Sequence, residues 1–221
     1  MTHTNRPTLR AYSRAEYLSD AVVHVSGLAA ALIGGPVLIA MAAIWLGEAG
    51  ITTAMIIYVV SMVLMLGCSA MYNMLQVPAW GDRLRRIDQS AIYVKIAGTY
   101  TPFVALTAAH AGWFLAAIWA VAATGAALIL LARGRMRLVS LTLYLGLGWA
   151  GAVWGGPLVF GLTPPGLTLL ATGGILYTAG VAFLLWDRLP FHNTIWHIFV
   201  LAATVVCYAA IMVELWVRIG V

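Results

Sequence analysis

Charged side chains are scarce in this chain. Only 9% of its 221 residues are Asp, Glu, Lys or Arg, whereas 63% are hydrophobic and the mean hydropathy is +0.96. A soluble domain is about half apolar and about a quarter charged, and so short a chain cannot bury this much apolar surface in one core. The composition therefore excludes an ordinary soluble protein and indicates an integral membrane protein.

Cysteines are also rare. Cys68 and Cys207 both fall inside apolar segments, where a thiol behaves as a small buried hydrophobe, so they do not indicate a disulfide framework. The first 19 residues are polar and the apolar run after them is too long for a signal-peptide core, so we expect no cleaved targeting sequence. The net charge of +5 comes from short basic clusters between apolar runs and does not predict nucleic-acid binding.

Long, unbroken apolar runs predict seven transmembrane helices. The predicted spans are residues 20–46, 51–77, 88–110, 113–132, 138–160, 167–186 and 193–217. A helix needs about 20 residues to cross a hydrocarbon core of about 30 Å, and each run is long enough. We therefore expect an all-α bundle, with residues 1–19 as a short polar N-terminal segment and residues 20–219 as a single transmembrane domain.

The basic residues predict the orientation of this bundle. With seven spans, ten of the twelve Lys and Arg residues lie on the side of the N-terminus, Arg218 lies on the opposite side, and Lys95 falls within the third span. The ten are Arg6, Arg10, Arg14, Arg83, Arg85, Arg86, Arg133, Arg135, Arg137 and Arg188. Because basic loops face the cytoplasm, we expect a cytoplasmic N-terminus and a C-terminus outside.

Polar side chains gather near the cytoplasmic ends of four predicted helices. They are His24; Ser69 and Asn73; Asp88 and Gln89; and His192, Asn193, Thr194 and His197. Ser69 and Asn73 are four residues apart and share a helix face, as do Asn193 and His197. His192 and His197 are five apart, about 140° around a helix, so they should not face one point. Polar groups at this depth are costly unless they serve a site or pair with one another.

Lys95 follows Asp88 by two helical turns and would lie about 10 Å deeper on the same face. A buried lysine needs a carboxylate or a water-filled cavity, and Asp88 is the nearest acid in the sequence.

Taken singly, the polar residues near the helix ends have ordinary interpretations: Asp88 as a helix cap, Ser69 bonded within its own helix, and His24 at the membrane interface. Their convergence from four helices favours a site.

Residues 86–103, RIDQSAIYVKIAGTYTPF, resemble the third-helix signature of bacterial hemolysin III proteins. This family belongs with the progestin and adiponectin receptors and, more widely, with the alkaline ceramidases. Residues 16–27, SAMYN at 69–73 and NTIWHIFVL at 193–201 agree with it, so the resemblance covers the whole predicted bundle. It implies seven helices with a cytoplasmic N-terminus in the bacterial inner membrane.

The resemblance also implies a zinc site. The family has Ser-x-x-x-His on the second helix, His-x-x-x-His on the seventh, and an aspartate on the third near the water on the metal. Here these positions read Ser69 with Asn73, Asn193 with His197, and Asp88. Asparagine is a poor zinc ligand compared with imidazole. The resemblance therefore predicts an altered zinc site that keeps His197, with His24 and His192 as candidate substitute ligands.

Three functions follow from these residues. The one favoured by the ligand substitutions is membrane homeostasis or lipid sensing, in which the polar residues lock the bundle or bind a lipid headgroup. The second is a metal-dependent hydrolase of a membrane lipid amide, with Asp88 and Ser69 as candidate catalytic residues. The third, a pore-forming cytolysin, is disfavoured because the sequence shows no ring of charges and no amphipathic spanning helix. The expected partners are membrane lipids.

Overall fold

The computed structural model describes residues 12–75, 77, 79–107, 111–131 and 137–220. These residues form helices and no strand. The helices are α1 (Arg14–Met41), its π-helical continuation η1 (Ala42–Leu46), α2 (Ala49–Met74), α3 (Gly81–Leu106), α4 (Gly112–Leu131), α5 (Arg137–Trp154), α6 (Gly156–Gly161), α7 (Pro164–Leu185) and α8 (His192–Ile219). The predicted N-terminal residues 1–11, the predicted helix ends at 108–110 and 132, and Arg133 and Arg135 lie outside the described residues.

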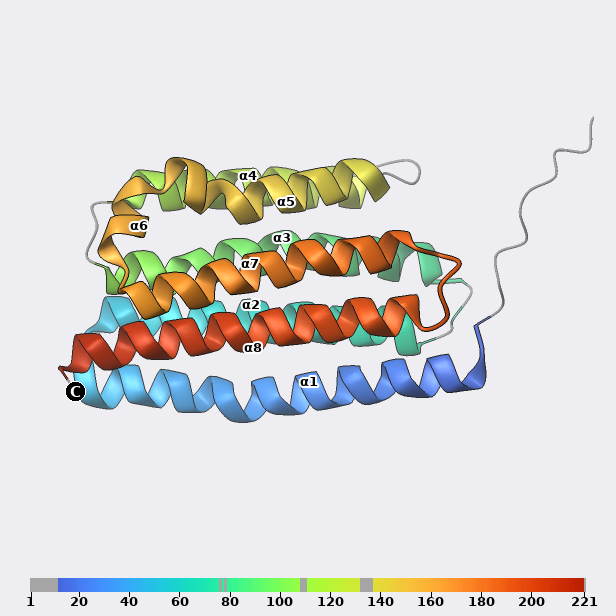
Figure 1. Cartoon of the computed structure of the whole chain (residues 1–221), viewed down its shortest axis with the longest axis horizontal. Coiled ribbons are helices and arrows are strands. Elements are labelled where there is room, and N and C mark those ends of the chain that lie inside the picture. The colour runs from blue at the N-terminus through green and yellow to red at the C-terminus, as the bar shows by residue number, and fades with distance from the viewer. Residues whose placement is uncertain (1–11, 76, 78, 108–110, 132–136, 221) are drawn as a thin grey trace, which may run out of the picture.

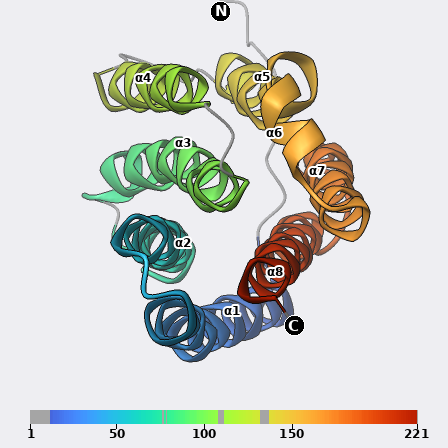
Figure 2. The same cartoon turned by 90° about the vertical axis from the view of Figure 1, so that its left-hand side faces the viewer.

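The long helices lie side by side along one axis, and consecutive ones run in opposite directions (Figure 1). Viewed along this axis, they form a ring in which α3 lies toward the inside, between α2 and α4, and the short α6 lies between α5 and α7 (Figure 2). Helix α3 packs against α2, α4, α5 and α8. Its side chains therefore face the interior of the bundle on several sides.

Five helices are long and apolar enough to cross a membrane: α1 with η1, α2, α4, α7 and α8. The outer surface agrees with this, since Ile33 is 71% exposed and Leu131 is 79% exposed. Large apolar side chains at this exposure indicate a surface that faces lipid or a partner. Helix α3 falls outside this class because it begins with charged turns, and α5 has only 18 residues and begins at Arg137. The count of seven spans stays a prediction.

Three helix boundaries differ clearly from the sequence prediction. Helix α3 begins at Gly81, seven residues before the predicted residue 88, so part of the expected charged connection is helical. Helix α1 begins at Arg14, earlier than residue 20, because Ser13 and Glu16 form a capping box. The Ser13 Oγ accepts a hydrogen bond from the Glu16 N–H at 3.2 Å, and the Ser13 N–H donates to Glu16 Oε2 at 2.9 Å. Helix α5 ends at Trp154, and the predicted continuation to residue 160 forms the separate α6, which starts after Gly155 with a proline in its first turn.

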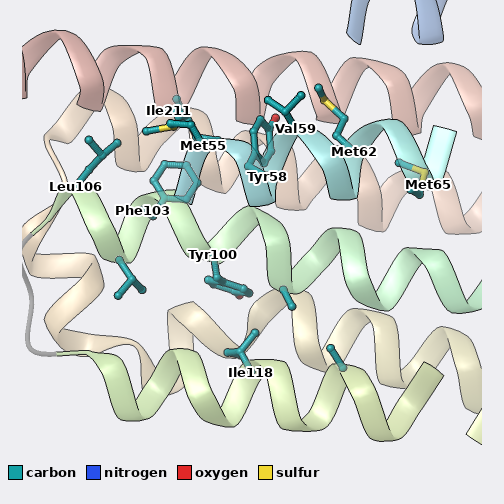
Figure 3. Packing of buried hydrophobic residues seen from close by; sticks show 14 of the residues in the cluster. Met55, Tyr58, Val59, Met62, Met65, Tyr100, Phe103, Leu106, Ile118 and Ile211 are labelled. Atoms are coloured by element: carbon teal, nitrogen blue, oxygen red, sulfur yellow. The ribbon is translucent and has the colours of Figure 1, made fainter. Parts of the chain in front are cut away.

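The core lies between α2, α3 and α8. Met55 and Tyr58 of α2, Phe103 of α3 and Ile211 of α8 are fully buried and point toward one another (Figure 3). Helices α2 and α3 approach closely at Gly98, where an added Cβ would lie 2.7 Å from the Cβ of Ser61. Small residues at such a crossing let two membrane helices pack by direct backbone contact.

Candidate functional site

Asp20 of α1 lies at the centre of a buried group of polar side chains. Its Oδ1 lies 2.6 Å from His197 Nδ1, and its Oδ2 accepts a hydrogen bond from Asn193 Nδ2 at 3.2 Å. His24, one turn further along α1, places Nδ1 2.8 Å from the main-chain oxygen of Asp20. Asp20 and His24 are each 4% exposed and His197 is 9% exposed. Hydrogen bonds to an ionised group in so dry a place are short and strong.

Helix α2 completes this group. Ser69 Oγ lies 3.2 Å from His24 Nε2, and Asn73 Nδ2 donates to the main-chain oxygen of Ser69 at 2.9 Å. The Asn73 Oδ1 accepts from Asn193 Nδ2 at 3.0 Å, which joins α2 to α8. We call the six residues Asp20, His24, Ser69, Asn73, Asn193 and His197 the polar cluster. Its members come from three helices and satisfy much of one another's hydrogen-bonding capacity, as buried polar groups require.

Glu16 holds the start of α8 against α1. It is 2% exposed, and its Oε1 accepts from the N–H of Phe191 at 2.9 Å, while its other oxygen belongs to the capping box of α1. Phe191, the residue before α8, has a left-handed backbone with φ of 59°. This contact fixes where the first turns of α8, which carry Asn193 and His197, meet α1. Tyr12 lies nearby, and burial together with the Asp20 carboxylate raises its pKa to about 12.

A cavity of about 210 Å³ begins at the polar cluster and continues along α3. Ser69 and His197 form part of its wall, as does Asp88 of α3. Most of the other lining residues are apolar and come from α3, α5, α7 and α8. The cavity also contains Lys95, whose Nζ donates to Tyr177 Oη at 2.9 Å. A polar site therefore opens directly onto an apolar chamber.

A family model described as "Haemolysin-III related" matches residues 14–208 of the chain. The chain belongs to the haemolysin III family. It is 36% identical to Hemolysin-3 of Bacillus cereus over 201 residues, covering 89% of this chain and 90% of that protein. It is 34% identical to the Hemolysin-3 homolog of Bacillus subtilis (strain 168) over 199 residues, covering 89% and 93%. A further relative, the human monocyte to macrophage differentiation factor, is 37% identical over 131 residues, 56% of this chain and 52% of that protein.

In this haemolysin III family member, most of the predicted site residues come together. His24, Ser69, Asn73, Asn193 and His197 all belong to the polar cluster, and Asp88 adjoins it through Ser69. The family match and the apolar helices together describe a multi-pass membrane protein.

Two predicted site residues lie elsewhere. His192 does not join the polar cluster: α8 begins at this residue, so it points away from His197 and lies near Asp187. Lys95 does not pair with Asp88, the nearest acid in the sequence, but with Tyr177 of α7. Asp88 and Lys95 are two turns apart on α3 and both line the cavity, but their nearness in the sequence does not become an ion pair.

Asp20 and Glu16 are the functional residues that sequence reasoning missed. Asp20 precedes His24 by four residues and therefore shares its helix face. An acidic residue on the same helix face as a histidine, at the start of an apolar run, could have indicated that Asp20 belongs to the site. Glu16 was identifiable from the Ser-x-x-Glu spacing with Ser13, which is typical of a capping box.

The donor atoms of the cluster fit a zinc ion only with a changed ligand set. The three-histidine set implied by the resemblance is absent, because Asn73 and Asn193 offer amides that bond to each other. Asp20, His24 and His197, however, each present a ligand atom within 4.8 Å of the others. Two imidazoles and a carboxylate are ligands that zinc accepts. The main-chain oxygen of Asp20 holds His24 by Nδ1 and leaves Nε2 as its ligand atom, the usual arrangement around a metal.

Proposed function

We propose that this haemolysin III family member is a seven-span protein of the bacterial inner membrane, related to the progestin and adiponectin receptors, that serves membrane homeostasis by sensing a lipid. Its N-terminus faces the cytoplasm and its C-terminus the outside. The arrangement of basic residues supports this orientation: six of the eight described ones belong to the end of the bundle where α1, α3 and α5 begin, and only Lys95 and Arg218 lie elsewhere (Figure 1). The six are Arg14, Arg83, Arg85, Arg86, Arg137 and Arg188.

The observation that carries the lipid proposal is the continuity between the polar cluster and the cavity. Ser69 and His197 belong to both, and Asp88 lies where they meet. The hydrogen-bonding groups at this end suit the polar part of a lipid, while the apolar walls along α3 suit a hydrocarbon chain. A site with this division recognises an amphiphile better than a fully polar or a fully apolar molecule.

The polar cluster in this proposal is an altered form of the family's zinc site. Asp20, His24 and His197 would hold the ion, and Asn193 would orient the Asp20 carboxylate through its 3.2 Å hydrogen bond. When bound, zinc supplies a Lewis acid and a fixed positive charge at the cavity mouth. Asn73 supports the site indirectly by accepting the second hydrogen bond of the Asn193 amide.

A second candidate function, hydrolysis of a lipid amide, is favoured by the surroundings of Ser69. Its hydroxyl lies 3.2 Å from His24 Nε2, and Ser69 and Asp88 both form part of the cavity wall. While His24 Nε2 holds no metal, a serine hydroxyl at this distance can pass its proton to the imidazole, which is what acyl-transfer chemistry requires.

Metal analysis of the purified full-length protein tests the site. After incubation with zinc and removal of excess, we expect one equivalent of zinc in the wild type and little in Asp20→Ala or His197→Ala. His192→Ala is the matched control, because His192 lies outside the cluster, and it should keep its zinc. The double variant Asn73→His with Asn193→His, which restores the family's ligands, should bind zinc more tightly. A metal-free wild type, or zinc retained in His197→Ala, contradicts the altered site.

Lipid turnover separates the two functions. We expect the wild type in lipid nanodiscs to leave an amide-linked lipid such as ceramide intact, because the favoured function is sensing. Chelator-sensitive release of a fatty acid that is lost in Asp88→Asn would instead establish the hydrolase and overturn the non-enzymatic proposal.

A further inference from the structure

Lys95 is a buried cation inside an apolar cavity. It is the single lysine of the chain, lies near the middle of α3, and is 3% exposed. Its Nζ donates to Tyr177 Oη at 2.9 Å and lies 5.1 Å from the centre of the tyrosine ring. Among the described residues, no acidic side chain forms an ion pair with it. The ammonium therefore has a neutral partner and no counter-ion.

A chain of hydrogen bonds holds this ammonium in place. Tyr177 Oη lies 2.8 Å from Thr204 Oγ1, and Thr204 in turn donates to the main-chain oxygen of Val200 at 2.8 Å. Because Thr204 uses its hydrogen on Val200, the tyrosine donates to Thr204 and accepts from Lys95. An ammonium has three N–H donors, and Tyr177 takes one of them. The remaining donors stand at the wall of the cavity, where they can meet a ligand.

The neighbouring acid does not neutralise Lys95. Asp88 lies two turns away on α3, about 10 Å along the helix axis, at the end of the cavity that Ser69 and His197 line. Removing a charged group from water costs several kcal/mol unless an opposite charge and hydrogen bonds compensate. An ionisable residue at membrane depth without such a partner marks the place where a charged ligand binds.

We infer that Lys95 binds the head of a single-chain amphiphile that carries one negative charge, with the hydrocarbon chain in the part of the cavity that extends toward α6. Beyond Lys95 the walls are apolar and include Phe103, Leu158 and Leu162. One ammonium balances one negative charge, which favours a carboxylate. The apolar walls of this cavity of about 210 Å³ suit a hydrocarbon chain next to that charge.

This inference rests on the proposal that the cavity receives a lipid, but it does not depend on zinc. It names the ligand class and places its charge away from the polar cluster, on a residue of the cavity wall. Asp20 and His197 variants that lose metal should therefore still bind the anion.

The test uses the full-length protein in phosphatidylcholine nanodiscs and the fluorescent carboxylic acid cis-parinaric acid as the probe. Trp149 and Trp196 line the cavity and can transfer excitation energy to a probe bound there. Specific binding is the part of this signal that a non-fluorescent competitor removes. We expect oleate to displace the probe at concentrations about tenfold or more below those of oleyl alcohol, a chain of the same length without the charge. The short carboxylate hexanoate should displace little.

Variants then locate the charge. Lys95→Met should weaken binding of the probe about tenfold or more, whereas Lys95→Arg, which keeps the charge, should stay within about threefold of the wild type. Arg218→Gln removes an exposed cation in the last turn of α8, outside the cavity, and should leave the affinity for the probe unchanged. The comparison of oleate with oleyl alcohol on the wild type tests the same charge without any substitution, so the inference remains testable where Lys95→Met does not fold.

The outcomes separate the inference from the proposed function. Equal displacement by oleate and oleyl alcohol overturns the anion site and leaves the lipid-binding cavity intact. Displacement by hexanoate as effective as that by oleate overturns an amphiphile in favour of a small soluble anion. A signal that no competitor removes overturns both the anion site and the lipid-binding cavity. Wild-type affinity in Lys95→Met shows that the charge binds elsewhere.

Discussion

Replacing Asp20 with alanine measures how far the polar cluster stabilises the contact between α1 and α8. In the wild type the carboxylate bonds to His197 Nδ1 at 2.6 Å and Asn193 Nδ2 at 3.2 Å. The substitution leaves both donors buried without this partner, and each buried unpaired donor costs about 1–3 kcal/mol. We expect the free energy of unfolding to fall by about 3 kcal/mol. For a chain of this length that corresponds to a melting temperature lower by about 6–12 °C.

Thermal unfolding can be followed through a buried cysteine. Cys207 is 3% exposed, so in a background that carries Cys68→Ala a thiol-reactive fluorophore reports the temperature at which α8 separates from the bundle. Glu48→Ala is the matched control, because this carboxylate is half-exposed and makes only a 3.5 Å pair with Arg218. Exposed pairs contribute under about 1 kcal/mol, so the control should melt close to the wild type.

An exchange variant tests the contact itself. Asp20→Asn with Asn193→Asp keeps one carboxylate and one amide across the same hydrogen bond, so it should recover part of the stability that Asp20→Asn loses. A melting temperature for Asp20→Ala within about 2 °C of the wild type would refute the reasoning, because it would mean that His197 and Asn193 find other partners at little cost. Strictly additive effects in the exchange variant would refute direct coupling between residues 20 and 193.

Two further predictions concern the packing of α2 on α3 and the ion pair between Arg137 and Asp187. Gly98→Ala should lower the free energy of unfolding by about 1–3 kcal/mol, because the added methyl group clashes with Ser61. Gly67→Ala is the control and should be neutral or slightly stabilising, since no atom lies within 4 Å of its added Cβ. Equal melting temperatures for the two variants would contradict the close α2–α3 packing. Hydrogen bonds from the Arg137 guanidinium lower the pKa of Asp187, so its carboxylate adds stability above the ordinary aspartate pKa of about 3.9 and loses it as the pH falls through the lower folded-state value. Asp187→Asn should therefore lower the free energy of unfolding at neutral pH by less than about 1 kcal/mol, because the pair is exposed. A difference from the wild type that persists in strong acid would argue against this pair.

Spacing along single helices identified several residues of the site correctly as neighbours. Ser69 with Asn73, and Asn193 with His197, share faces because four residues make about one helical turn. The same geometry placed His192 about 140° from His197, and the structure keeps it outside the cluster. These are local properties of one helix, so they can be read without knowing its neighbours.

The sequence by itself determined the class and the family of this protein. The long apolar runs, the shortage of charge and the signature of residues 86–103 are local features, and hydrophobicity acts on each segment independently of how the segments pack. Only the tertiary structure decided that Asp20 is the centre of the site and that Lys95 meets Tyr177, 82 residues later, instead of Asp88. The physical reason is that spacing gives the face and depth of a side chain, whereas the rotation of each helix toward its neighbours is set by contacts such as Gly98 against Ser61 and Glu16 against Phe191.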